Sequence, residues 1–307
     1  MSSALKSSIR QLREQIEKLS VPVAPELTDP LQWAERVAFK PDPWQADLLL
    51  KLTQDNEPHK IALSCSRQVG KSTTSGLCAA ARAIQGGAVF IVSPTLRQSQ
   101  ALLKTTRGFV ERTGVRVVRE TATYIEISGG GSVTAAPGNM PAFIRGASLA
   151  TPPMGAGSKP RKPSILIVDE AAFCKSELWG AVNPMVAAAP DASVVLISTP
   201  CGLGSYFADV VHDDESGFEK IVITAEQCPR ISAEYLAGQK RRLGDALFSQ
   251  EFEGKFVSTN GMTVFSAEAI SAFFGEYAGD DEETIIRPET LDQPNDEPTP
   301  KIRMWSF

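Results

Sequence analysis

The sequence predicts an α/β protein whose mostly parallel sheet is flanked by helices. Short runs of aliphatic and β-branched residues have the composition of strands buried on both faces, namely KIALSC (60–65), AVFIVS (88–93), ILIVDE (165–170) and SVVLIST (193–199). An alanine-rich helical stretch, STTSGLCAAARAI (72–84), separates the first two. Strands that alternate with helices along a chain are typical of a parallel sheet.

The remaining elements continue this alternation. In chain order we expect a helix LRQSQALLKTTRGFVERT (96–113), strands VRVVRE (115–120), YIEIS (124–128), SVTAA (132–136) and IVIT (221–224), and a helix over 232–253 with a basic middle. The Pro-, Gly- and Ser-rich stretch 149–164 indicates a surface loop. Residues 3–19 place apolar side chains on one stripe, which predicts an N-terminal helix.

The composition of the 307-residue chain argues against several classes of protein. Its net charge of −5 means that any contact with nucleic acid must come from a local basic face. The five cysteines form no C-x-x-C pair and there are only two histidines, which argues against structural zinc and a disulfide framework. No apolar run is long enough to span a bilayer and no signal peptide is recognisable, so we expect no membrane contact and a cytoplasmic compartment.

The stretch CSRQVGKST (65–73) leads from a predicted strand directly into a predicted helix. In such a loop the main-chain N–H groups surround phosphate oxygens, Lys71 bridges the outer phosphates, and the hydroxyl of Ser72 coordinates Mg²⁺. The usual pattern G-x-x-x-x-G-K-[ST] begins with a glycine, and here Cys65 stands in its place. From the loop alone, a phosphate site and a helix start that merely contains Gly-Lys-Ser are equal alternatives.

Two acidic residues, Asp169 and Glu170, end the buried strand 165–170. A carboxylate at this position can bind Mg²⁺ through water, and the adjacent one can orient and deprotonate an attacking water. Two neighbouring carboxylates are costly to bury unless a cation or positive side chains neutralise them. We therefore favour a site for Mg²⁺ and phosphate over the alternative, a solvated strand end.

Two further stretches complete the set of candidate nucleotide contacts. LISTP (196–200) is a buried strand that ends in Ser198 and Thr199, whose hydroxyls could sense a γ-phosphate. PDPWQADLL (41–49) contains Gln45, and an amide can both donate to and accept from the adenine edge, which would favour ATP over GTP, although for this stretch alone a helix start with no role in binding is the favoured alternative. The guanine signature N-K-x-D is absent from the sequence.

With these four elements in this order, the chain resembles the ATPase domain of phage terminase large subunits, the DNA-packaging motors of tailed viruses. The resemblance covers roughly residues 35–265. It is carried by Gln45 as the adenine motif, SRQVGKST (66–73) as a phosphate loop with an inserted arginine, AAPGNMPAFIRG (135–146), IVDEAAF (167–173) as the magnesium and carboxylate motif, ISTPCG (197–202) as the coupling motif, and a closing segment over 223–257. It implies a P-loop NTPase of the RecA-like (ASCE) type with a small helical closing segment.

The resemblance also implies ATP and Mg²⁺ as cofactors. The nucleotide-binding residues would be Gln45, Ser66, Arg67, Gln68, Val69, Gly70, Lys71, Ser72 and Thr73. Ser72 and Asp169 would hold Mg²⁺, Glu170 would be the catalytic base, and Thr199 would couple hydrolysis to movement. Arg67 would neutralise charge on the γ-phosphate in the transition state, the alternative being a loop arginine paired with a nearby carboxylate.

Arg145 is the candidate for a catalytic arginine supplied in trans by a neighbouring subunit. The long Pro- and Gly-rich loop that follows it departs from the family pattern and leaves this role open. Terminase large subunits usually continue into a nuclease domain with an RNase H-like fold, and we expect no nuclease in this chain. The acidic run 280–283 has the composition of a solvated segment rather than a metal site.

These assignments divide the chain into an N-terminal helix and linker (1–30), a P-loop ATPase core (31–225), a closing segment (226–265) and an acidic, proline-rich tail that we expect to be disordered (266–307). One alternative is a superfamily 2-like DNA helicase or translocase, although too few residues follow the closing segment for the second domain that it needs. Another is an ATP-binding assembly module without catalysis.

Double-stranded DNA is the expected partner of a packaging motor, which holds the duplex through its phosphates without reading bases. Three basic patches are candidate contacts, each with a solvated face as the alternative: Arg97, Lys104 and Arg107; Lys159, Arg161 and Lys162; and Lys240, Arg241 and Arg242. The resemblance further implies a portal protein, a small terminase subunit and a homo-oligomeric ring, acting in the host cytoplasm and transiently on the procapsid.

Overall fold

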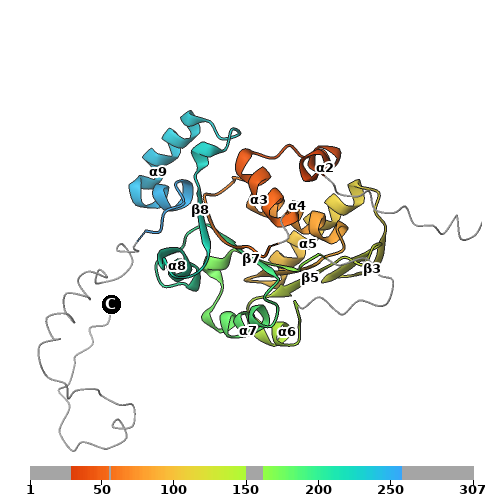
Figure 1. Ribbon diagram of the computed structural model, residues 1–307. Coiled ribbons are helices and arrows are strands. Elements are labelled where there is room, and N and C mark those ends of the chain that lie inside the picture. Colours follow the sequence, from red (N-terminus) through yellow and green to blue (C-terminus); the bar gives the residue numbers. More distant parts are fainter. Residues whose placement is uncertain (1–28, 55–56, 150–161, 258–307) are drawn as a thin grey trace, which may run out of the picture. The chain divides into compact units, whose positions relative to one another are not determined.

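The computed structural model describes residues 29–54, 57–149 and 162–257 (Figure 1). The expected N-terminal helix, most of the expected loop 149–164 and the acidic tail lie outside the described residues. The described residues belong to one compact unit that ends at Ser258. Within them, every helix is too short or too polar to cross a membrane.

One sheet of eight strands forms the centre of the described part, in the order β3-β4-β5-β2-β6-β7-β1-β8. The strands are β1 (Lys60–Cys65), β2 (Ala88–Ser93), β3 (Val117–Thr121), β4 (Tyr124–Ile127), β5 (Ser132–Pro137), β6 (Ile165–Asp169), β7 (Ser193–Ser198) and β8 (Glu219–Ile223). All neighbours from β5 to β8 are parallel, whereas β4 is antiparallel to both β3 and β5. The predicted mostly parallel α/β sheet is confirmed.

Helices cover both faces of this sheet. They are α2 (Pro30–Arg36), α3 (Pro43–Thr53), α4 (Lys71–Ile84), α5 (Leu96–Arg112), α6 (Pro141–Arg145), α7 (Ser176–Ala187), α8 (Tyr206–His212) and α9 (Ala233–Phe252), with short 3₁₀ turns η1 (Ala171–Phe173) and η2 (Ala225–Gln227). Figure 1 shows α2 to α5 on one face and α6 to α8 on the other. α9 packs on η2, which follows the edge strand β8.

Alternating side chains of the central strands fill two separate cores. In β6, Ile165 and Ile167 pack with α4 and α5, whereas Leu166 and Val168 pack with α7 and α8. Successive side chains of a strand point to opposite faces, so a strand between two helical layers needs apolar residues at every position. This explains the unbroken aliphatic runs from which the strands were predicted.

Several helices differ from the sequence-based expectation, which also contains no helix at α2 or α6. The pattern predicts neither α7 nor α8. In α7, Gly180 and Pro184 interrupt the helical period, although Leu178 and Val182 are buried. The helix expected over 232–253 is broken at Gly244, whose φ of 74° and ψ of 168° are not helical. Glycine adopts such angles without steric cost, so the break falls there.

Candidate nucleotide site

The carboxyl ends of β1, β6 and β7 meet at one edge of the sheet. Asp169 at the end of β6 is paired in register with Ile197 of β7, and Ser198 at the end of β7 is paired with Ser64 of β1. Because the three strands are parallel neighbours, the residues that follow each of them emerge side by side. The loop that follows β1 therefore lies beside the acidic end of β6.

Lys71, the first residue of α4, is the centre of the resulting cluster. Its side chain is almost buried, and its Nζ donates a hydrogen bond to Thr199 Oγ1 over 2.6 Å. The same Nζ lies 3.5 Å from Glu170 Oε1. The structure thus brings together Lys71, Thr199 and Glu170, which come from three different parts of the sequence.

Glu170 is held by its backbone and by the end of β7. Its φ of 54° is left-handed, a conformation that costs a residue with a side chain about 1–2 kcal/mol. Ser198 Oγ lies 3.5 Å from Glu170 Oε2 and accepts a hydrogen bond from the N–H of Ala172 over 3.1 Å. A strained carboxylate next to a buried ammonium is typical of functional sites.

Asp169 presents a buried oxygen that has no protein partner. The side chain is 5% exposed, and among the described residues no donor reaches its Oδ1. Burial, followed by the charge of Glu170, raises the pKa of Asp169 to about 6, and Lys71 opposes this shift. A hard cation such as Mg²⁺ would satisfy this oxygen, and Ser72, the expected second ligand, is exposed at the start of α4.

The phosphate loop between β1 and α4 forms a concave array of main-chain donors. Gln68 and Gly70 have left-handed φ angles of 63° and 96°. In the described part of the chain, the N–H groups from Gln68 to Thr73 make no hydrogen bond. Successive free N–H groups at the positive end of a helix make an anion site.

The loop accommodates Cys65 at the position where the usual pattern has its first glycine. Cys65 is the last residue of β1, is fully buried and has no left-handed φ, so a side chain is accommodated without strain. Burial raises the pKa of its thiol to about 12, which keeps the sulfur protonated and neutral beside Lys71.

Gln45 lies against the phosphate loop and uses both ends of its amide within the chain. It is almost completely buried in α3. Its Oε1 accepts from the N–H of Asp42 over 2.8 Å, and its Nε2 donates to the carbonyl of Val69 over 3.3 Å. The residue expected at the adenine edge therefore also supports the loop that would bind phosphate.

Arg67 pairs with a carboxylate that no sequence pattern indicated. Its Nε is ion-paired with Glu251 of α9, and its N–H donates to the Glu251 carbonyl over 2.8 Å. The Arg67 side chain is 60% exposed. The alternative considered from the sequence, a loop arginine paired with a nearby carboxylate, describes this arrangement.

Arg145 is the last residue of α6 and is exposed. Among the described residues its side chain makes no ion pair or hydrogen bond, and it contacts neither Lys71 nor Glu170. It thus lies outside the cluster around Lys71.

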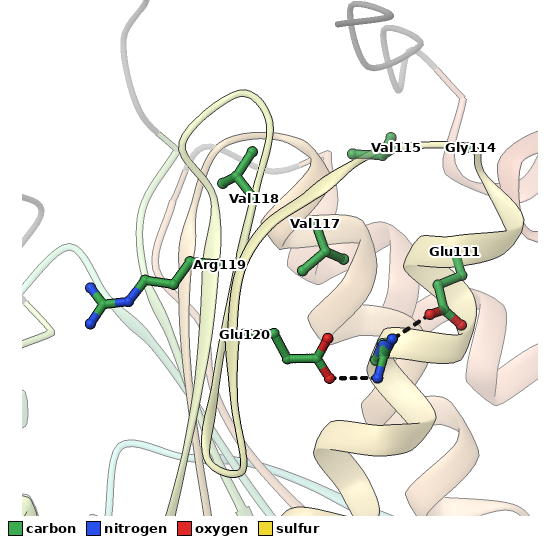
Figure 2. Close-up of a pocket in the computed structure, with 8 residues that line it drawn as sticks. Glu111, Gly114, Val115, Val117, Val118, Arg119 and Glu120 are labelled. Carbon is green, nitrogen blue, oxygen red and sulfur yellow. Dashed lines mark hydrogen bonds and ion pairs between the residues drawn. The ribbon is translucent and has the colours of Figure 1, made fainter.

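The candidate basic patches differ in how much of their charge is neutralised. Arg107 of α5 is ion-paired with both Glu111 and Glu120, and these residues line an open pocket of about 490 Å³ between α5 and β3. Figure 2 shows the two carboxylates directed at the same guanidinium, with Arg119 pointing away from it. This surface does not offer a free positive charge at Arg107. Lys159 and Arg161 lie outside the described residues.

The third patch, on α9, keeps two free cations. Lys240 lies 3.7 Å from Asp245 and over the ring of Phe248. Arg241 and Arg242 are exposed, and neither is ion-paired among the described residues. α9 therefore presents two unpaired positive charges to solvent, as α5 does at the exposed Arg97 and Lys104, which are likewise not ion-paired among the described residues.

Together, the parallel sheet, the phosphate loop and the carboxylates at its edge define a P-loop NTPase of the RecA-like type. Residues 62–272 match the family model described as terminase large subunit, T4likevirus-type, N-terminal. The chain belongs to this family. The resemblance drawn from the ordered motifs is confirmed.

Solved structures of terminases have the same fold. The ATPase domain of the large terminase of Thermus phage P74-26 is 20% identical with a TM-score of 0.58, and the match covers 74% of this chain and 98% of that one. A large terminase from a thermophilic bacteriophage, solved in complex with ADP, is 15% identical with a TM-score of 0.53, and the match covers 71% of this chain and 54% of that one. This chain thus matches about half of the second terminase. No curated protein matches the sequence.

Proposed function

We propose that this domain binds ATP and Mg²⁺ at the cluster around Lys71 and hydrolyses the ATP to move double-stranded DNA into a procapsid. The observation that carries the proposal is the convergence of Lys71, Glu170 and Thr199 beside an array of free N–H groups, in a member of the terminase large subunit family. The structures of the thermophilic phage terminase that contain ADP or ATP-γ-S support a nucleotide at this fold.

The phosphate loop would bind the β- and γ-phosphates through its N–H groups and through the ammonium of Lys71. Ser72 and Asp169 would hold Mg²⁺, which neutralises charge on the phosphate oxygens when bound. Mg²⁺ would also remove the cost of burying an ionised Asp169 beside Glu170. Gln45 is buried and uses both ends of its amide within the chain, so it would have to be uncovered to contact the adenine edge.

Glu170 would be the general base of hydrolysis. It would take a proton from a water whose oxygen attacks the γ-phosphorus, while the bond to the β–γ bridging oxygen breaks and its electron pair stays on ADP. Ser198 Oγ accepts from the N–H of Ala172 and donates to the carbonyl oxygen of Thr199 over 2.9 Å, and it would turn its hydrogen to Glu170 to keep this carboxylate in place.

Arg67 pairs with Glu251 through Nε alone, and movement of its guanidinium toward a phosphoryl oxygen of the nucleotide would break this pair. Release of this pair would loosen α9 from the phosphate loop, so that the state of the nucleotide changes the position of the basic surface on α9.

Arg145 of one subunit would complete the site of the next in a homo-oligomeric ring. Portal protein and a small terminase subunit are the partners that this role requires, in the host cytoplasm and on the procapsid.

The experiment that tests the proposal is Mg²⁺-dependent ATP hydrolysis, measured over a range of protein concentrations with and without double-stranded DNA. Glu170→Gln removes the base, and Glu177→Gln is the matched control on an exposed glutamate at the start of α7. We expect Glu170→Gln to lower kcat by about 10²–10⁴-fold and Glu177→Gln to leave it unchanged.

The dependence on concentration separates the possible mechanisms. Activity per subunit that rises with concentration, and that Arg145→Ala removes, supports a ring whose sites are completed in trans. Constant activity per subunit means that the site is complete within one chain and discards the role of Arg145. ATP binding without hydrolysis at any concentration, with DNA present, would favour the ATP-binding assembly module instead.

A further inference from the structure

A bidentate ion pair lies beside the phosphate loop and has no part in the mechanism proposed above. Arg230, between η2 and α9, donates from Nη1 to Asp42 Oδ1 over 2.9 Å and from Nη2 to Asp42 Oδ2 over 2.8 Å. Asp42 is almost buried and is the N-cap of α3, whereas about half of the Arg230 side chain is exposed. Such parallel contacts fix a guanidinium in direction as well as in position.

The same guanidinium also contacts the phosphate loop. Arg230 Nη2 donates to the carbonyl oxygen of Val69 over 3.2 Å, and Gln45 Nε2 donates to the same oxygen over 3.3 Å. A carbonyl oxygen has two lone pairs, so these two donors occupy both. The carbonyl of Val69 is therefore held on the side of the loop that faces α3 and the closing segment.

This contact determines the direction of an N–H group in the loop. The peptide between Val69 and Gly70 is trans and planar, so its N–H points opposite to its carbonyl. With the carbonyl held by Arg230 and Gln45, the N–H of Gly70 is turned away from them, where it makes no hydrogen bond among the described residues. Space is tight here, since a Cβ on Gly70 would lie 2.9 Å from Gln45 Nε2.

We propose that Arg230 is a positioning residue for the phosphate loop. Anchored by Asp42, it holds the carbonyl of Val69 and so directs the N–H of Gly70 toward a phosphate of the nucleotide. Because Arg230 belongs to the closing segment, the affinity of the loop for nucleoside triphosphate depends on how that segment is seated. The inference rests on the proposed function, since it assumes that the loop binds nucleotide.

If the Arg230–Asp42 ion pair only stabilised the fold, its removal would lower the free energy of unfolding. Nucleotide binding by the folded protein would then be unchanged. The chain offers a matched pair for comparison, because Lys51 at the other end of α3 is ion-paired with Glu219 of β8 and has no contact with Val69. Both pairs connect α3 to the C-terminal part of the described chain.

The test measures equilibrium binding of a fluorescent ATP analogue, steady-state ATP hydrolysis and thermal unfolding for Arg230→Met, Arg230→Lys and Lys51→Met. We expect Arg230→Met to raise Kd and KM about tenfold, with kcat changed by less than about twofold, because a charge-assisted hydrogen bond that orients the loop is lost. Arg230→Lys should recover part of the affinity. Lys51→Met should leave Kd unchanged.

Each other outcome counts against the inference in a recognisable way. Wild-type affinity in folded Arg230→Met overturns it, and so does an equal loss of affinity in Lys51→Met, which would mean that both pairs act through stability. If Arg230→Met does not fold, Asp42→Asn keeps a good N-cap residue and removes the anchoring charge, and an unchanged Kd there also overturns it. A wild-type chain that binds no nucleotide would instead refute the proposed function itself.

Discussion

The ammonium of Lys71 donates a hydrogen bond to Thr199 over 2.6 Å, so the start of α4 and the end of β7 are connected by a buried contact. The same ammonium lies 3.5 Å from Glu170, which is the longer of the two contacts. Thr199 thus shares the charge of Lys71 with the candidate base.

Thr199→Val should lower the rate of hydrolysis more than it lowers nucleotide affinity. Valine lacks the hydroxyl, so Lys71 would turn to Glu170, and a carboxylate held by a closer ammonium would be less free to orient the attacking water. We expect kcat to fall about tenfold, a fraction of the roughly 10²–10⁴-fold that a positioned general base contributes. Steady-state kinetics with Thr199→Ser as the control test this. Equal kcat in the valine and serine variants would show that the hydroxyl has no such role.

Glu251→Gln should favour ATP over ADP. In the proposed mechanism the carboxylate of Glu251 would compete with the γ-phosphate for Arg67, and ADP offers no γ-phosphate. Removal of the competing charge should tighten ATP binding about fivefold, as expected for a partly exposed ion pair, and leave ADP binding unchanged. Titration calorimetry with both nucleotides measures this. Glu253→Gln is the control, because Glu253 is paired with Lys255 and not with Arg67, and a similar gain there would refute the competition.

Asp169→Asn should stabilise the nucleotide-free protein at alkaline pH. The pKa of Asp169 is raised from 3.8 to about 6, mainly by burial. The proton therefore contributes stability that is complete below pH 3.8 and is lost as the pH rises through about 6. At pH 8 the ionised carboxylate costs up to about 3 kcal/mol, which asparagine avoids.

Urea unfolding of Asp169→Asn at pH 8 and at pH 5, without Mg²⁺, measures this difference. The gain in unfolding free energy should be larger at pH 8. The exposed Asp191 provides the control variant Asp191→Asn, for which no gain is expected. Equal gains for Asp169→Asn at the two pH values would mean that ionisation of this carboxyl is not what asparagine relieves.

Gly131→Ala should destabilise the fold, whereas Gly108→Ala should not. A Cβ on Gly131 would lie 1.8 Å from the carbonyl oxygen of Ala83, so the turn before β5 would have to move away from α4. Such overpacking costs about 1–3 kcal/mol. Gly108 lies inside α5 with open space around it, and alanine should gain about 0.5–1 kcal/mol there. Thermal unfolding of the two variants should therefore shift in opposite directions.

Much of the fold and the centre of the site were predictable because their signals are local. Unbroken aliphatic runs identify β1, β6 and β7, and Lys71, Asp169 and Thr199 each follow or end such a run. Parallel neighbours place these ends at one edge of the sheet, so the cluster follows from the strands alone. The helix α4 and its phosphate loop follow from a contiguous motif.

The tertiary structure alone decided which distant residues complete this site. Glu251 is ion-paired with Arg67, and Arg230 is hydrogen-bonded to Asp42 across 188 residues. No local sequence pattern identifies Glu251 or Arg230 as the partner. A charged side chain on a helix surface has the same sequence signature whether it meets solvent or a loop folded against it. The sequence by itself determined the chemistry at the carboxyl edge of the sheet. Only packing of the closing segment determined what holds the phosphate loop, because that contact depends on long-range geometry and not on local periodicity.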